Sequence, residues 1–82
     1  MTISEPLILY TRAGCHLCEQ AEALVLPLLA GAQLQLVPVE ISESPALVER
    51  YGVRIPVLRL EGAQRELGWP FDERMVQHYL HA

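Results

Sequence analysis

The chain has 82 residues, 51% of them hydrophobic, and a net charge of −4; this describes one small folded domain and excludes an intrinsically disordered chain. Its apolar runs are too short and too broken to span a bilayer. The six basic residues are all arginines scattered along the sequence, so the clustered positive charge that nucleic acids and anionic membrane surfaces require is missing, and we expect neither as a partner.

The N-terminal residues 1–6 contain neither a basic stretch nor an apolar stretch, so the sequence indicates no secretory signal. We therefore expect a cytoplasmic protein, in a compartment where structural disulfides are rare. The chain has two cysteines, Cys15 and Cys18. In the chain-entropy model, a bridge across so short a loop constrains the unfolded chain by only about 2 kcal/mol. We therefore interpret the two cysteines as a reactive pair and not as a structural cross-link.

The N-terminal half predicts two strands joined by a helix. Residues 7–11 are apolar on both alternate faces, which is typical of a central strand covered on both sides. A helical pattern begins near His16, is interrupted at Pro27 and ends near Gly31. Residues 34–39 predict a second strand, and its Pro38 has no N–H to donate to a neighbour, which indicates a sheet edge. Two strands joined in this way favour a right-handed parallel crossover.

The middle of the chain predicts a short helix followed by a strand, a turn and a returning strand. Ser44 suits the N-cap of the helix, Pro45 its first position and Gly52 its C-terminal cap. The segments that follow are a strand at 56–60, a turn at 61–63 and a short strand at 64–67.

The last predicted element is a helix that begins near Asp72, which is a good N-cap residue. Phe71 has the spacing to pack on Val76 across the start of this helix. The stripe expected to be buried consists of Met75, Val76, Tyr79 and Leu80. The element order is therefore β-α-β-α-β-β-α, which predicts an α/β domain with one mixed sheet and helices on both faces.

The two cysteines lie directly after the first predicted strand and at the start of the first predicted helix. At a helix start, unpaired backbone N–H groups and the positive end of the helix dipole favour a thiolate. If Cys15 is the N-cap, the N–H groups of Leu17 and Cys18 point at its sulfur, and its pKa falls below the free value of about 8.5. Cys18 lies one turn further in and is expected to be more buried. We therefore expect Cys15 to attack a substrate disulfide and Cys18 to resolve the mixed disulfide.

Other interpretations of these residues stay open. The cysteines also fit a pair of inert small hydrophobic residues, or part of a zinc site, although zinc needs four ligands and no second Cys-x-x-Cys is present. His78 and His81 lie roughly 9 and 13 Å along the last helix, out of reach of Cys15 if that helix starts near it. We assign no metal site. His16 is either an exposed first-turn residue or a cation that stabilises the Cys15 thiolate and so tunes its pKa.

Three stretches of the sequence resemble the glutaredoxin-like family of the thioredoxin-fold superfamily. They are 10–19 (YTRAGCHLCE), 51–57 (YGVRIPV) and 69–72 (WPFD). With the element order, the resemblance covers residues 7–80. It implies a thioredoxin-like fold in a single domain spanning residues 1–82, with a four-stranded mixed sheet in the order 2-1-3-4. That order places the second strand at an edge, in agreement with Pro38.

The resemblance also implies roles for individual residues. Pro56 is expected to be cis and to lie against the cysteine pair, which leaves the backbone of Ile55 open to an extended peptide or to glutathione. Arg12 stands three residues before Cys15, where glutaredoxins often carry a basic residue that meets a carboxylate of glutathione. Arg54 is a second candidate for binding. Both arginines also fit exposed residues with no role in binding.

Two stretches depart from the family pattern. His16 and Leu17 stand between the cysteines, where glutaredoxins usually have Pro-Tyr. Before the last helix, Trp69 and Pro70 stand near the place of a Gly-Gly pair that holds one end of glutathione. Trp69 is a packing anchor in the core, part of the groove wall or a contact to a partner.

We therefore interpret the chain as a thiol–disulfide oxidoreductase of glutaredoxin-like type, in which Cys15 and Cys18 are catalytic. No prosthetic group is required, glutathione is the candidate co-substrate, and protein disulfides or glutathione are the expected partners of a monomer. The alternative is a binding module of the same fold that lacks turnover, or a carrier of a metal or iron–sulfur cluster that uses the same cysteines. A coloured, concentration-dependent dimer favours the cluster, and one bound zinc favours the metal site.

Overall fold

A computed structural model describes residues 5–81 of the chain. Residues 1–4, part of the segment in which no secretory signal is expected, and Ala82 lie outside the described residues. The elements, with η for a 3-10 helix, are β1 (Glu5–Thr11), α1 (His16–Val25), η1 (Leu26–Leu29), β2 (Leu34–Glu40), η2 (Ile41–Glu43), α2 (Pro45–Tyr51), β3 (Val57–Leu60), β4 (Leu67–Gly68) and α3 (Glu73–His81). The predicted order of strands and α-helices is confirmed, and η2 is an addition.

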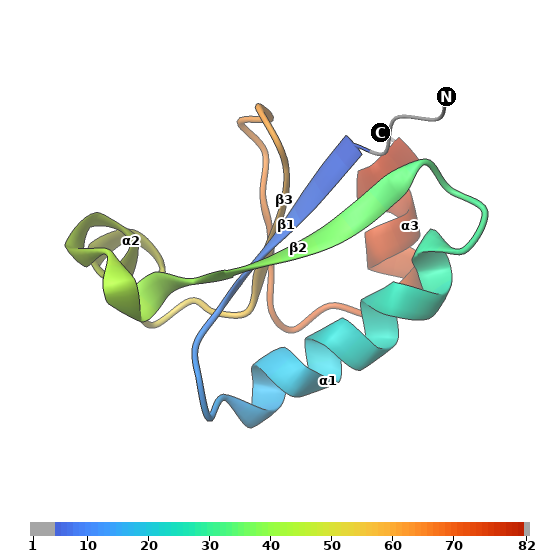
Figure 1. The fold of residues 1–82 in the computed structure, drawn as a ribbon. Helices are drawn as coiled ribbons and strands as arrows, with labels where there is room; N and C mark the ends of the chain where they lie inside the picture. The colour runs from blue at the N-terminus through green and yellow to red at the C-terminus, as the bar shows by residue number, and fades with distance from the viewer. Residues whose placement is uncertain (1–4, 82) are drawn as a thin grey trace.

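The four strands form one sheet in the order β2-β1-β3-β4, as predicted. Figure 1 labels β1, β2 and β3 of this sheet. β2 runs parallel to β1, with Thr11 opposite Glu40, and β3 runs antiparallel to β1, with Tyr10 opposite Val57. Pro38 lies in the edge strand β2, as its missing donor requires. The ends of β1 and β2 and the beginning of β3 therefore lie at one end of the sheet.

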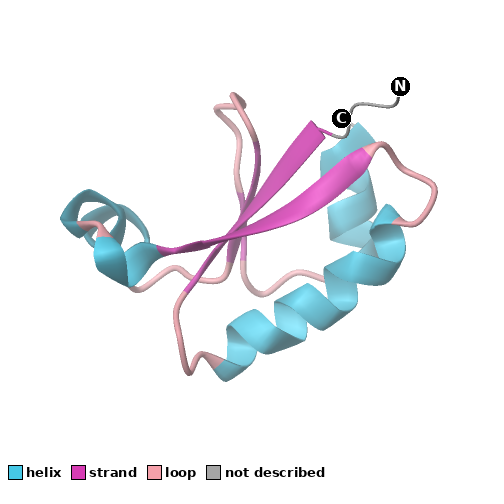
Figure 2. Cartoon of the chain, in the orientation of Figure 1, coloured by secondary structure: helices cyan, strands magenta, loops and turns pink. Residues whose placement is uncertain are grey.

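Helices cover both faces of the sheet, as Figure 2 shows. On β1, Leu7 and Leu9 face one side and Ile8 and Tyr10 the other, because successive side chains of a strand alternate. The core under α1 and α3 consists of Leu7, Leu9, Ala21, Val25, Leu29, Leu58, Phe71, Val76 and Tyr79. The core under α2 and η2 consists of Tyr10, Ile41, Tyr51 and Val57. β1 is therefore the central strand covered on both sides that its apolar sequence predicts.

The first helix is interrupted where the sequence predicts it. α1 ends at Val25 and continues as η1, in which Pro27 occupies the first turn. Proline has no N–H for the i→i−4 bond, so a tighter 3-10 turn replaces the regular helix. Gly31 follows with a positive φ of 81°, a conformation that glycine adopts without a steric penalty. This ends the helical segment and directs the chain into β2.

The boundaries of α2 are the predicted ones, and Gly52 is its C-cap residue, as expected. The Ser44 side chain accepts the N–H of Leu47 at 3.4 Å, and Pro45 is the first helical residue. Gly52 keeps a right-handed conformation with φ −51°. A Cβ at this position would lie 2.5 Å from the Val48 carbonyl oxygen, so close backbone packing requires the glycine.

The returning strand β4 is shorter than predicted, spanning only Leu67–Gly68 instead of 64–67. The side chain of Tyr79 explains the difference. The Leu60 N–H donates to the Tyr79 hydroxyl at 3.0 Å, and this hydroxyl donates to the Arg65 carbonyl at 2.7 Å. The hydroxyl thus bridges two backbone groups that would otherwise extend the strand pairing.

Helix α3 begins after Asp72, whose carboxylate accepts the Met75 N–H at 2.8 Å, as predicted for an N-cap. Val76 and Tyr79 are buried and Leu80 is half-buried. Met75 was expected in the same stripe, but this prediction is wrong because its side chain is 43% exposed. It is adjacent to Val76 and so points about 100° away around the helix. Within residues 5–81, no helix has the length and apolar character needed to traverse a bilayer.

Candidate active site

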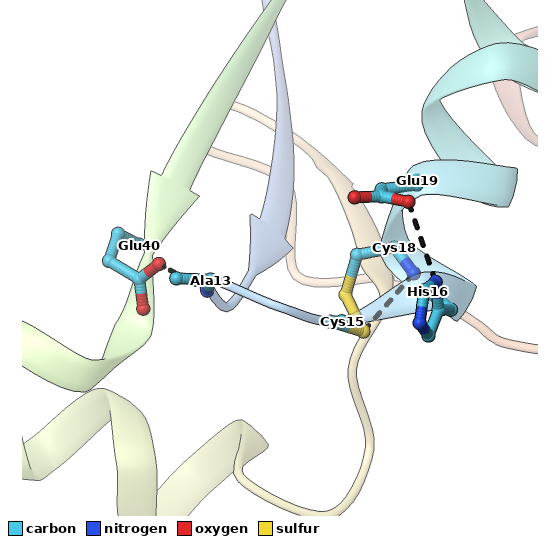
Figure 3. Close-up of a disulfide and its surroundings, with 6 residues drawn as sticks. All are labelled: Ala13, Cys15, His16, Cys18, Glu19 and Glu40. Carbon is cyan, nitrogen blue, oxygen red and sulfur yellow. Dashed lines mark hydrogen bonds and ion pairs between the residues drawn. A yellow bond between two sulfur atoms is a disulfide. The ribbon is translucent and has the colours of Figure 1, made fainter.

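The cysteine pair lies at the start of α1, where Cys15 is the N-cap residue (Figure 3). The Cys18 N–H donates to Cys15 Sγ at 3.1 Å, and the two residues form a disulfide with their Cα atoms 5.2 Å apart. Cys15 is half-buried, whereas Cys18 is only 3% exposed. The predicted N-cap position and the deeper burial of Cys18 are confirmed. The second expected donor, the Leu17 N–H, makes no such bond in the described part of the chain.

A tight turn carries the chain from β1 into this helix. The Cys15 N–H donates to the Arg12 carbonyl at 3.2 Å, which closes a four-residue turn. Gly14 is the third residue of the turn and has a positive φ of 79°, the conformation that favours glycine at this position. The backbone of Cys15 is therefore fixed on one side by this turn and on the other by α1, where its carbonyl accepts the Glu19 N–H at 3.2 Å.

The turn is attached to the neighbouring strand through Glu40, the last residue of β2. Glu40 Oε2 accepts the Ala13 N–H at 2.8 Å (Figure 3). Glu40 Oε1 accepts both the hydroxyl of Ser42 at 2.5 Å and its N–H at 3.0 Å. The two hydrogen bonds from Ser42 lower the pKa of the Glu40 carboxyl most. Desolvation opposes them, and the weaker effects of the Ala13 N–H and the Arg12 charge lower the pKa further. The carboxylate is thus held in its charged form beside the turn.

The Ile55-Pro56 peptide bond is cis, and the Trp69-Pro70 bond is cis as well. Because Val57 pairs with Tyr10 near the end of β1, the Ile55-Pro56 bend lies at the same end of the sheet as the turn to Cys15. The Ile55 backbone is less open than the resemblance implies, since its N–H donates to the Tyr51 carbonyl at 3.1 Å. Within residues 5–81 its carbonyl receives no hydrogen bond.

Arg54 takes part in an ion-pair cluster on the α2 face of the sheet. Its Nη2 lies 2.9 Å from Glu66 Oε1, and Arg50 lies 3.9 Å from the other carboxylate oxygen of Glu66. The Tyr51 hydroxyl donates to Glu66 as well, and the Tyr51 ring stacks on Tyr10 with the ring centroids 4.0 Å apart. Arg54 therefore binds a carboxylate of this chain, so its use by a substrate would require release from Glu66.

The cluster changes the acidity of both of its acidic groups. Burial, followed by the hydrogen bonds with Glu66 and Tyr10, raises the pKa of the Tyr51 hydroxyl to about 12. Burial acts to raise the pKa of Glu66, but the bonds from Tyr51 and Arg54 and the charges of Arg54 and Arg50 outweigh it, so that pKa is lowered. Glu66 is thus ionised at neutral pH while its side chain is only 13% exposed.

The other predicted site residues are exposed or packed. His16 points at Glu19, with Nδ1 3.6 Å from Oε2, and both side chains are largely in solvent (Figure 3). Arg12 is exposed on the turn. Trp69 packs edge-on against Phe71 and borders the core under α1 and α3, as expected for a packing anchor. Within residues 5–81, His, Cys, Asp and Glu side chains do not gather in a group of three that could hold a metal.

Glu40 and Glu66 were not predicted from the sequence. A signal for Glu40 exists, because Glu40 ends the second parallel strand just as the turn to Cys15 ends the first, and the carboxyl ends of parallel neighbours meet at one edge. Glu66 gives no such signal, since its partners Tyr51 and Arg54 lie 15 and 12 residues away in the sequence.

The family model described as Glutaredoxin-like domain (DUF836) matches residues 6–81. The chain belongs to this glutaredoxin-like family. The X-ray structure of the protein XcR50 from X. campestris is 41% identical in sequence to this domain, covers 92% of it and 95% of its own chain, and superimposes with a TM-score of 0.78. The solution structure of the protein Ne2328 from Nitrosomonas europaea is 28% identical, with coverage of 96% and 94% and a TM-score of 0.78.

The fold of this glutaredoxin-like domain is also that of thioredoxin. A single-residue mutant of the thioredoxin from Halobacterium salinarum is 24% identical, with a TM-score of 0.71 over 96% of this chain and 74% of the other. The predicted thioredoxin-like architecture is thereby confirmed. Family membership and the Cys-x-x-Cys pair at the start of α1 together support a redox-type role.

Proposed function

We propose that this glutaredoxin-like domain is a thiol–disulfide oxidoreductase that works through both cysteines. The observation that carries the proposal is the arrangement at the start of α1. Cys15 is half-buried, with its sulfur at a backbone N–H, whereas Cys18 is almost completely buried one turn further on. Backbone donors and the dipole at a helix start stabilise a thiolate. The more accessible sulfur is therefore also the activated one.

The reaction proceeds in two exchanges. The Cys15 thiolate attacks one sulfur of a substrate disulfide, so a Cys15–substrate disulfide forms, the substrate bond breaks, and the other substrate sulfur leaves as a thiolate that takes a proton. The Cys18 thiol then loses its proton to solvent and attacks Cys15 Sγ, which forms the Cys15–Cys18 disulfide and releases the second substrate thiolate. The substrate gains two electrons and the domain loses two. Two molecules of an external thiol, with glutathione as the candidate, then reduce the Cys15–Cys18 disulfide and leave as their own disulfide.

The residues around the cysteines supply a place for the substrate. The carbonyl of Ile55, ahead of Pro56, accepts no hydrogen bond from residues 5–81 and is available to an N–H of an extended peptide or of glutathione. Arg12 is exposed three residues before Cys15 and offers a guanidinium to a substrate carboxylate. Arg54 would contribute only after leaving Glu66. We also propose that the domain acts as a cytoplasmic monomer on protein disulfides or on glutathione disulfide.

A covalent trapping experiment tests the proposed function. With Cys18→Ser, the mixed disulfide on Cys15 has no neighbouring thiol to resolve it, so incubation with glutathione disulfide is expected to add one glutathionyl group, placed on Cys15 by peptide mapping. Mass spectrometry of the intact protein measures the adduct. Cys15→Ser is the matched control and is expected to remain largely unmodified, because the remaining Cys18 is buried. An unmodified Cys18→Ser protein would overturn the proposal.

A further inference from the structure

Glu40 contacts the turn that carries Cys15 without being part of the cysteine motif. It comes from the edge strand β2, 27 residues beyond the Ala13 N–H that it accepts. In Figure 3 its side chain reaches the turn from the side opposite the two sulfur atoms. We infer that Glu40 is a positioning residue, which fixes the turn and thereby the direction in which the Cys15 sulfur meets a substrate; the catalytic part of this inference rests on the proposed function.

The Glu40 carboxylate is itself held in place, which a residue that positions the turn requires. Oε1 is held by the N–H and the hydroxyl of Ser42, so Oε2 is directed at Ala13. The strand pairing of Thr11 with Glu40 brings the two segments together independently of these bonds. Hydrogen bonds to a charged acceptor are stronger than those to a neutral one. The turn is therefore attached to the sheet by a charged and doubly anchored acceptor.

Holding Ala13 restrains Cys15 because both belong to the same four-residue turn. Ala13 is its second residue, and the Cys15 N–H closes it on the Arg12 carbonyl. The only residue between them, Gly14, has no Cβ and tolerates many backbone conformations. Without Glu40, the turn would keep its closing bond but lose its attachment to β2. The sulfur would then sample more orientations relative to the Ile55-Pro56 bend.

The negative charge of Glu40 would have the opposite effect on the rate at which Cys15 captures a disulfide. A carboxylate near a thiolate disfavours the thiolate, so a purely electrostatic Glu40 would slow Cys15, and its removal would accelerate capture of a disulfide. A positioning Glu40 speeds capture, and its removal slows it. The two effects also differ in the glutamine variant, which loses the charge. Its one amide oxygen can still accept the Ala13 N–H, and its NH2 group can donate to the Ser42 hydroxyl, although the bond from the Ser42 N–H is lost.

The experiment compares Glu40→Ala and Glu40→Gln with Glu43→Ala, which removes the same charge from an exposed residue of η2. In the oxidised protein, the exchange of the Ala13 amide with water, measured by NMR, is expected to rise about tenfold with Glu40→Ala and to stay unchanged with Glu43→Ala. In the Cys18→Ser background, Glu40→Ala is expected to slow the capture of glutathione disulfide several-fold and to slow alkylation by iodoacetamide less. Glu40→Gln is expected to restore most of the rate at which glutathione disulfide is captured.

The outcomes separate the positioning role of Glu40 from the proposed function. An unchanged exchange rate of the Ala13 amide in Glu40→Ala would overturn the proposal that Glu40 holds the turn. Faster capture of glutathione disulfide in both Glu40→Ala and Glu40→Gln would also overturn it, because loss of the charge alone would have that effect. A general increase of exchange across β1 and α1 in both variants would also overturn it, since it reports loss of stability. If the Cys18→Ser parent captures no glutathione, the proposed function fails and with it the catalytic part of the inference, while the exchange of Ala13 still decides whether Glu40 holds the turn.

Discussion

Replacing Cys15 with serine is expected to lower the turnover of a protein disulfide by more than about 100-fold, to the rate of the reductant alone, because a serine hydroxyl at this pH is a very weak nucleophile compared with a thiolate. Cys15 is the half-buried sulfur at the helix start, and the other cysteine is only 3% exposed. Cys18 cannot take over the first attack from that position. Reduction of a peptide disulfide by glutathione, followed with a thiol reagent, measures the loss.

Cys18→Ser is the matched control for this loss, since it also removes one of the two sulfurs. It is expected to keep the first exchange and to lose the second, so turnover of a protein disulfide falls while a mixed disulfide accumulates on Cys15. Equal loss in both variants, with no accumulated mixed disulfide, would contradict the separate roles of Cys15 and Cys18. Turnover that survives Cys15→Ser would contradict the assignment of the nucleophile.

Replacing Glu66 with alanine is expected to lower the free energy of unfolding by about 2 kcal/mol and the Tm by about 10 °C. The carboxylate accepts the hydroxyl of Tyr51 and a guanidinium N–H of Arg54. Without it, the Tyr51 hydroxyl, part of a side chain that is 1% exposed, loses its acceptor in an environment with little water. Urea unfolding followed by circular dichroism measures the change, and Glu61→Ala, exposed in the same hairpin, is the control.

The loss caused by Glu66→Ala should depend on pH in a defined direction. The pKa of Glu66 is lowered from its ordinary value of 4.5, so the carboxylate contributes stability above that value and loses it as the pH falls through the lower folded value. The difference between wild type and variant is therefore expected to be full at pH 7 and to shrink on acidification below about 4.5. A difference that is the same at pH 7 and at pH 3, or a loss equal to that of Glu61→Ala, would contradict the role of the cluster.

The elements that the sequence predicts well are those with local causes. The continuous apolar run of β1, the interruption of α1 at Pro27 and the N-cap residues Ser44 and Asp72 each act within a few residues of themselves. The placement of Cys15 as an N-cap belongs to the same class, because it needs only a strand, a turn and a helix. The sheet order came from the resemblance to a family, since nothing local sets which strands pair.

The features that the sequence did not predict depend on contacts between distant residues. The shortened β4 results from the hydroxyl of Tyr79, which lies 19 residues from the Leu60 N–H that it accepts. Arg54, a candidate for substrate binding that also fitted an exposed residue without such a role, is paired with Glu66 in the β3–β4 hairpin. The backbone of Ile55 was expected to be open to a substrate, but its N–H donates to the carbonyl of Tyr51 at the end of α2. Each of these outcomes follows from tertiary packing and leaves no periodic pattern in the sequence.

The residues of the candidate site lie together because three strands place them at one end of the sheet. The turn and the cysteines follow β1, Glu40 ends β2, and the Ile55-Pro56 bend precedes β3. The Tyr51 carbonyl accepts the N–H groups of Arg54 and Ile55 at 2.8 and 3.1 Å. Tyr51, the last residue of α2, therefore also supports the Ile55-Pro56 bend. A site assembled from three strand ends in this way is positioned by the register of the sheet.

We propose above all that the start of α1 activates the sulfur of Cys15. The most direct measurement is the rate of Cys15 alkylation by iodoacetamide as a function of pH in reduced Cys18→Ser protein, with Cys15→Ser reporting on Cys18 in the same way. We predict a midpoint for Cys15 clearly below the value of about 8.5 for free cysteine, and a higher midpoint or slower reaction for Cys18. A midpoint for Cys15 at or above that of free cysteine would contradict the claim.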